Sequence, residues 1–160
     1  MEGGAVEKMF EALKSKDSRQ LRCYLDICTR CGLCSEACHV YQTTRRSDLM
    51  PYSRAGLLRH FRRPGLTAAG GFFSSSVTSV EYDEQRLDEM SRAAYTCTGC
   101  RRCITCCPLG IDLAWIIGVE KAILAAAGRV PEEIDLLTET SIEKENSIEI
   151  YRDLMRSQIR

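Results

Sequence analysis

Two stretches of the chain share one cysteine spacing: Cys28-Thr-Arg-Cys31-Gly-Leu-Cys34-Ser-Glu-Ala-Cys38 and Cys97-Thr-Gly-Cys100-Arg-Arg-Cys103-Ile-Thr-Cys106-Cys107-Pro108. Both follow the pattern C-x2-C-x2-C-x3-C, the spacing with which a chain binds iron–sulfur cubanes. Two-residue gaps let a tight loop pass along one face of a cubane and bring three thiolates to three of its irons. A chain with two such runs is therefore expected to hold two 4Fe–4S clusters.

The fourth cysteine of each run is too far along the chain to close the same cube, so it binds the other cluster. This rule predicts two crossed ligand sets. Cluster 1 is expected on Cys28, Cys31, Cys34 and Cys107, and cluster 2 on Cys97, Cys100, Cys103 and Cys38. Each fourth cysteine is expected just inside the helix that follows its run.

Two cysteines fall outside these sets. Cys23 has no partner at a ligand spacing and is expected to be a small buried apolar side chain. Cys106 is an alternative ligand to its neighbour Cys107 if the helix register shifts. Cys107 is preferred because it keeps the three-residue gap and precedes Pro108. Cys106 would then be a nearby thiol with redox reactivity.

Five further residues lie between or beside the predicted ligands. Gly32 and Gly99 suit a close approach of the backbone to inorganic sulfide. Arg101 and Arg102 place positive charge there, which would raise the reduction potential or attract an acidic partner. His39 directly follows the first run. It either packs or hydrogen-bonds beside the cluster, or couples proton movement to electron movement.

Zinc and disulfides are the competing uses of these cysteines. Structural zinc sites use two C-x2-4-C pairs with a gap, so the runs would waste ligands, and a zinc-stabilised interaction module is the minor alternative. The N-terminus has no secretory signal, which predicts a reducing cytoplasm where disulfides are rare. No apolar stretch is long enough for a direct membrane span. The 22 basic and 22 acidic residues balance, so no nucleic-acid partner is expected.

Hydrophobic periodicity predicts a mainly α fold. Helices are expected over residues 6–16, 53–64 with Ser53 as N-cap, 83–95 with Asp83 as N-cap, and from Asp112 to a stop at Gly128, with a restart at Pro131. Residues 21–27 are expected as a short strand or an extended approach to the first run. The Gly- and Ser-rich residues 67–79 are expected to form a loop.

The second run with its flanks, residues 96–112, followed by Gly128-Arg-Val-Pro-Glu132, resembles the alpha-helical ferredoxin domain of the heterodisulfide reductase family. This family includes the C subunit of heterodisulfide reductase and the N-terminal part of fused iron–sulfur oxidoreductases in membrane complexes of anaerobes. The ending Cys34-x3-Cys38-His39 is similar to that of the iron–sulfur subunit of the membrane complex tied to dissimilatory sulfite reduction. The resemblance covers about residues 27–133.

The resemblance implies an alpha-helical ferredoxin with two 4Fe–4S clusters and a long insert between the cysteine motifs. Three parts are expected: an N-terminal helical extension over 1–20, the ferredoxin domain over 21–130, and a C-terminal helical arm over 131–160. The cysteine-rich C-C-G repeats of the fused members do not occur before Arg160. The chain is therefore expected to be either a separate electron-carrying subunit or one part of a longer polypeptide.

The resemblance also implies an electron-transfer subunit of a multi-subunit oxidoreductase. Its partners would be a cysteine-rich catalytic subunit and a donor, either a flavoprotein or a membrane quinone-linked subunit. Its place would be cytoplasmic, or peripheral on the cytoplasmic face of a membrane complex. The alternative is part of an enzyme that reduces disulfides or persulfides, either with its catalytic domain outside this chain or at a site including Cys106 or His39. The full set of eight ligands argues against a substrate site here.

Overall fold

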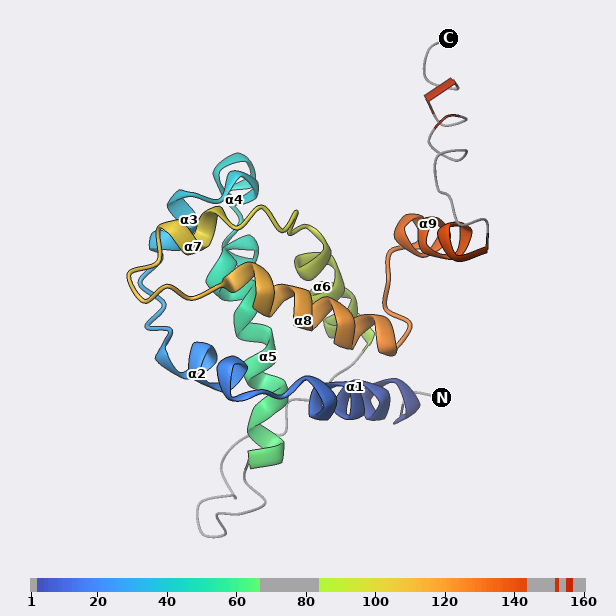
Figure 1. Ribbon diagram of the computed structural model, residues 1–160, viewed down its shortest axis with the longest axis horizontal. Helices are drawn as coiled ribbons and strands as arrows, with labels where there is room; N and C mark the ends of the chain where they lie inside the picture. The colour runs from blue at the N-terminus through green and yellow to red at the C-terminus, as the bar shows by residue number, and fades with distance from the viewer. Residues whose placement is uncertain (1–2, 67–83, 144–151, 153–154, 157–160) are drawn as a thin grey trace. The chain divides into compact units, whose positions relative to one another are not determined.

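The computed structural model describes residues 3–66, 84–143, 152 and 155–156. Within those ranges every regular element is a helix (Figure 1), so the expected mainly α fold is confirmed. The chain divides into two compact units, Met1–Arg129 and Val130–Arg160. The separate N-terminal extension over 1–20 stays a prediction.

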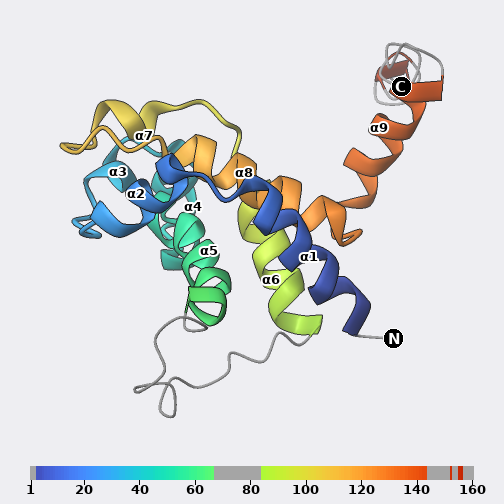
Figure 2. The same ribbon diagram turned by 60° about the horizontal axis from the view of Figure 1, so that its bottom comes forward.

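The first unit is arranged around α8. In chain order its elements are α1 (Gly3–Lys16), α2 (Arg19–Ile27), α3 (Leu33–Glu36), α4 (His39–Thr44), the 3-10 helix η1 (Ser47–Leu49), α5 (Pro51–Leu66), α6 (Glu84–Tyr95), α7 (Arg102–Thr105) and α8 (Leu113–Ala126). Helices α1, α5 and α6 all pack against α8 (Figures 1 and 2). None of the helices among the described residues is long and apolar enough to cross a membrane.

The core lies between these four helices. Met9 and Leu13 of α1, one turn apart, are buried together with Leu58 of α5 and Leu87 of α6. On α8 the buried residues cover more than one face: Leu113, Ile116, Ile117, Val119, Glu120, Ile123 and Leu124. Burial of each large aliphatic side chain contributes about 1.5–3 kcal/mol, so α8 is the element that the packing fixes most firmly.

The expectation of a strand or extended segment over residues 21–27 is wrong, because these residues belong to α2. Ser18 caps this helix, and its hydroxyl accepts a hydrogen bond from the backbone N–H of Leu21 at 3.1 Å. Leu21 and Leu25 lie one turn apart and are both buried. The alternation of apolar and polar residues therefore reflects one buried stripe of a short helix.

The observed ends of α5 and α8 can be compared with the helix starts and stops that the sequence predicts. Helix α5 begins at Pro51 rather than after Ser53, and it ends two residues beyond Pro64. The helix start expected at Asp112 is confirmed, and Asp112 is the N-cap residue of α8: its carboxylate accepts a hydrogen bond from the Trp115 N–H at 2.9 Å. Gly128 follows α8 with φ +71°, as a helix-ending glycine does. Asp83 and residues 67–79 lie outside the described residues.

The second unit contains α9 (Glu132–Glu143). Pro131 lies one position before this helix, and its carbonyl accepts hydrogen bonds from the N–H groups of Ile134 and Asp135. The first turn is acidic, with Glu132, Glu133 and Asp135, which suits the positive end of the helix dipole. Most of the predicted arm beyond this helix lies outside the described residues.

Candidate iron–sulfur centres

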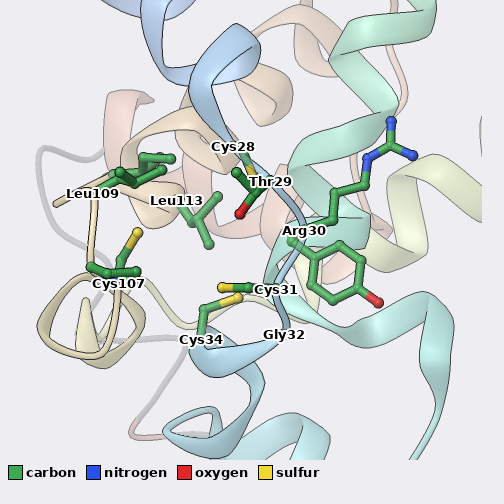
Figure 3. A pocket seen from close by; sticks show the side chains of 12 residues that line it. Cys28, Thr29, Arg30, Cys31, Gly32, Cys34, Cys107, Leu109 and Leu113 are labelled. Atoms are coloured by element: carbon green, nitrogen blue, oxygen red, sulfur yellow. The ribbon is translucent and has the colours of Figure 1, made fainter.

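A pocket of about 340 Å³ lies between the first cysteine run and the turn after α7. Figure 3 shows thiols of the run facing this space, with Cys107 reaching it from the other side. Its remaining lining is mostly apolar and includes Leu109 and Leu113. Arg30 also lines the pocket, but its guanidinium extends away from the sulfurs (Figure 3). The cysteines that line this pocket are Cys28, Cys31, Cys34 and Cys107.

A second pocket, also of about 340 Å³, lies at the second run. The cysteines that line it are Cys38, Cys97, Cys100 and Cys103. Its other walls differ from those of the first pocket because His39, Arg54, Arg101 and Arg102 all contribute to it. Each pocket thus gathers three cysteines of one run and the fourth cysteine of the other run.

The donor set of both pockets fits a 4Fe–4S cluster. Such a cluster takes four cysteine thiolates, one on each iron, so its ligands must surround a volume. The thiols here do so, since four cysteines line each pocket. The structure therefore brings together the two predicted sets, and ligation by them stays a prediction.

The loops of the two runs have positive φ at the same two positions. In the first run Arg30 and Gly32 have positive φ, at 58° and 85°; in the second run Gly99 and Arg101 do, at 68° and 60°. These are corresponding positions on either side of the second cysteine, with glycine and arginine exchanged. Successive turns of this kind direct backbone N–H groups into a concave anion-binding surface. The repeat in the sequence is thus also a repeat in the backbone.

The third cysteine of each run is buried in a four-residue helix and faces the first turn of a longer helix. Burial raises the pKa of Cys34, against an opposing hydrogen bond from the backbone of Tyr52, the second residue of α5. Burial likewise raises the pKa of Cys103 to about 11, against a hydrogen bond from the backbone of Ala114, the second residue of α8. The positive ends of α5 and α8 therefore each point at one thiol, where they would stabilise negative charge.

In each run one cationic side chain donates a hydrogen bond to the backbone carbonyl of the first cysteine. The sequence predicted neither contact. The guanidinium of Arg59 donates to the carbonyl of Cys28 at 3.3 Å, and the ammonium of Lys121 donates to the carbonyl of Cys97 at 2.7 Å. Lys121 also lies 5.3 Å from the ring centroid of Tyr95. The signal for these roles is weak in the sequence, since each cation is far along the chain from its carbonyl.

Other expected residues are placed as follows. Cys23 is exposed, so its expected burial is wrong: it lies on the solvent side of α2, opposite Leu21 and Leu25. Cys106 is also exposed and lines neither described pocket. The Nδ1 of His39 is 3.9 Å from the Sγ of Cys100.

Each fourth cysteine was expected just inside the helix that follows its run, and this expectation is wrong. Cys38 is the N-cap residue of α4, and Cys107 lies in the turn after α7. A position just outside a helix leaves each of these side chains free to face the pocket of the other run.

Comparison with known proteins supports the same chemistry. The chain matches the 4Fe-4S dicluster domain family over residues 24–111, a segment that contains both runs. A curated relative from Archaeoglobus fulgidus, "Hdr-like menaquinol oxidoreductase iron-sulfur subunit 2", is 39% identical over 124 residues, which cover 76% of this chain and 22% of the relative. A second relative, "Hdr-like menaquinol oxidoreductase iron-sulfur subunit" from Archaeoglobus profundus, is 30% identical over 142 residues, which cover 89% of this chain and 26% of the relative. No solved structure matches the chain.

The chain spans about a quarter of the length of these curated relatives or less. Their names confirm the resemblance to the heterodisulfide reductase group, and the family description confirms the expected pair of 4Fe–4S clusters. Because the matched segment holds both cysteine runs and more than half of the residues, the chain belongs to the 4Fe-4S dicluster domain family.

Proposed function

We propose that this chain transfers single electrons through two 4Fe–4S clusters as part of a larger quinol-linked oxidoreductase. Cluster 1 is assigned to Cys28, Cys31, Cys34 and Cys107, and cluster 2 to Cys97, Cys100, Cys103 and Cys38. The clusters supply the one-electron chemistry. The protein separates them from water, fixes their spacing and sets their potentials through charge and hydrogen bonds.

The observation that carries the proposal is the contact between the two sites. Helices α3 and α7 lie side by side (Figures 1 and 2), and each contains the buried third cysteine of its run. Cys34 and Cys103 are close enough for the charge on one to raise the pKa of the other. Two clusters held by these thiols would be near neighbours with protein packed between them, which suits electron tunnelling.

Each proposed cluster also has a side open to a partner. On the first site Cys31 is exposed, and two apolar side chains, Leu33 after it in the chain and Leu109 on the Cys107 side of the pocket, are about half exposed. On the second site Cys100 is exposed, with Arg101 and Arg102 next to it. One electron could thus enter at one end and leave at the other, and we assign the basic end to an acidic redox partner.

The relatives are menaquinol oxidoreductase subunits of much greater length, which supports a quinone-linked partner for this chain. We assign substrate chemistry to a cysteine-rich catalytic partner and place the assembly at the cytoplasmic face of a membrane. The eight cysteines of the two sites are all used as ligands in this proposal, so this chain contributes no catalytic residue.

The test is purification of the full chain without oxygen, followed by iron and sulfide analysis and EPR before and after dithionite. About eight irons per chain with reducible cubane signals are expected. Cys106→Ser is the matched control and should keep all of them. About seven irons with an oxidised 3Fe–4S signal would overturn the full ligand set, and zinc with little iron would overturn the proposal.

A further inference from the structure

Two charged side chains are buried in the core of the first unit. Arg54 of α5 and Glu120 of α8 are each 1% exposed. Neither Glu120 carboxylate oxygen has a hydrogen-bond partner, and the Nε and one terminal nitrogen of Arg54 have none either. Buried charges without hydrogen bonds destabilise a fold, and apolar residues of similar size are often more stable. A role other than stability is therefore the better account of these residues.

Both residues are close to the second cysteine pocket. Arg54 lines this pocket directly, together with Ala114 and Ile117 of α8. Glu120 follows Ile117 by three residues, so it lies on the same side of α8, roughly 4.5 Å further along the helix axis. The charge of Arg54 acts on the Glu120 carboxyl group. Arg54 thus lines the second pocket and also interacts electrostatically with the Glu120 carboxyl group.

One further charged group faces Arg54: the pKa of Asp48 on η1 is lowered mainly by its hydrogen bond with Arg46 and in part by the charge of Arg54. The charged groups on the other neighbouring elements face elsewhere. On α1, α6 and α7 the charged side chains whose positions are described are exposed. Arg59 of α5 donates to the carbonyl of Cys28, and Lys121 of α8 donates to that of Cys97. Among the described residues Arg54 is thus the buried cation that faces Glu120. Burial raises the pKa of Glu120 well above its ordinary value, and Arg54 opposes this rise.

We propose that Glu120 takes up a proton when the second site is reduced, and that Arg54 transmits the change of charge between them. The inference rests on the proposed function. As one electron arrives from the redox donor, one proton from water forms an O–H bond at the Glu120 carboxylate. When the electron leaves to the acceptor, the carboxyl group returns the proton to water. The core then gains no net charge in either state, which lowers the cost of adding an electron inside the protein.

Potentiometric EPR titration of the full cluster-loaded chain between about pH 6 and pH 9 tests this proposal. A tenfold change in proton concentration should change the reduction equilibrium of cluster 2 tenfold, which is 59 mV for one electron. The cluster 2 signal is identified as the one that changes in Cys100→Ser. Glu120→Gln should remove the pH dependence, and the exposed Glu11→Gln on α1 should keep it. A pH-independent cluster 2 potential in the unmodified chain overturns the inference.

A second measurement needs no variant. The infrared difference spectrum of reduced minus oxidised chain should gain a protonated carboxyl band that shifts in D2O, and absence of this band overturns the inference. These outcomes are distinct from failure of the proposed function. A chain that holds eight irons but shows neither effect still carries electrons without proton uptake, whereas a chain without reducible clusters fails the proposed function itself.

Discussion

The left-handed residues of the two loops allow a quantitative test of the loop conformation. A non-glycine residue in this conformation costs roughly 1–2 kcal/mol because its Cβ approaches the backbone. We consider two matched pairs of substitutions: Gly32→Ala and Gly99→Ala add a Cβ, while Arg30→Gly and Arg101→Gly remove one. All four positions have φ between 58° and 85°.

The magnitudes follow from the surroundings of each position. An added Cβ at Gly32 or Gly99 meets nothing within 4 Å, so its cost is conformational alone. That cost is reduced by about 0.4–1 kcal/mol because alanine restricts the unfolded chain. The net destabilisation is about 1 kcal/mol, and Arg30→Gly should stabilise by a similar amount. Arg101→Gly should gain less, since Arg101 pairs with Asp112 at 3.4 Å and exposed pairs contribute about 0–1 kcal/mol.

The assay is anaerobic thermal unfolding of the cluster-loaded chain, followed by circular dichroism and by cluster absorbance at one scan rate. A change of 1 kcal/mol corresponds to about 2–4 °C in Tm for a chain of this size. We expect Arg30→Gly above the unmodified chain and both alanine variants below it. If Arg30→Gly lowered Tm as much as Gly99→Ala, the two loops would not share a left-handed conformation, and the reasoning would be refuted.

Three further predictions concern single contacts. Cys38→Ala should abolish the EPR signal of cluster 2 and leave that of cluster 1; loss of the cluster 1 signal instead would disprove the crossed assignment. Lys121→Met should destabilise the chain by about 1.5–3 kcal/mol, because the Cys97 carbonyl loses a charged donor, while the exposed Lys8→Met should have little effect on Tm. Asp112→Ala should cost about 1 kcal/mol through the lost cap of α8, as measured by the same melts, and an unchanged Tm would contradict this role.

The cysteine spacing was sufficient to predict which thiols come together. Because the gaps within a run are short, the loop has few ways to present its first three cysteines, and the fourth must point elsewhere. The helix start at Asp112 was predicted as well, and the structure adds that the Asp112 side chain caps this helix by accepting a hydrogen bond from the backbone three residues away. Such local geometry is encoded by neighbouring residues, so a single sequence reveals it.

The contacts that hold the sites from outside could not be predicted in this way. Arg59 is 31 residues from Cys28, and Lys121 is 24 residues from Cys97. Arg54 and Glu120 meet only because α5 packs on α8. In the sequence each of these residues looks like one more charged residue on an exposed helix face. Whether its side chain is buried depends on how the helices pack. The misassigned residues 21–27 failed for a related reason, since a nine-residue helix shows too few turns for its period to be distinct.

The two sites have positive φ at matching loop positions but differ in charge, and under the proposed function this difference would give electron transfer a direction. Arg54, Arg101 and Arg102 line the second pocket, whereas the first pocket has Arg30, whose guanidinium extends away from the thiols. Salt screens the exposed arginines but affects the buried Arg54 much less. Its positive charge favours an added electron, and protonation of Glu120 would leave that charge unopposed. Under the proposed assignment, cluster 2 should therefore hold the electron more tightly, with transfer running from the apolar end to the basic end.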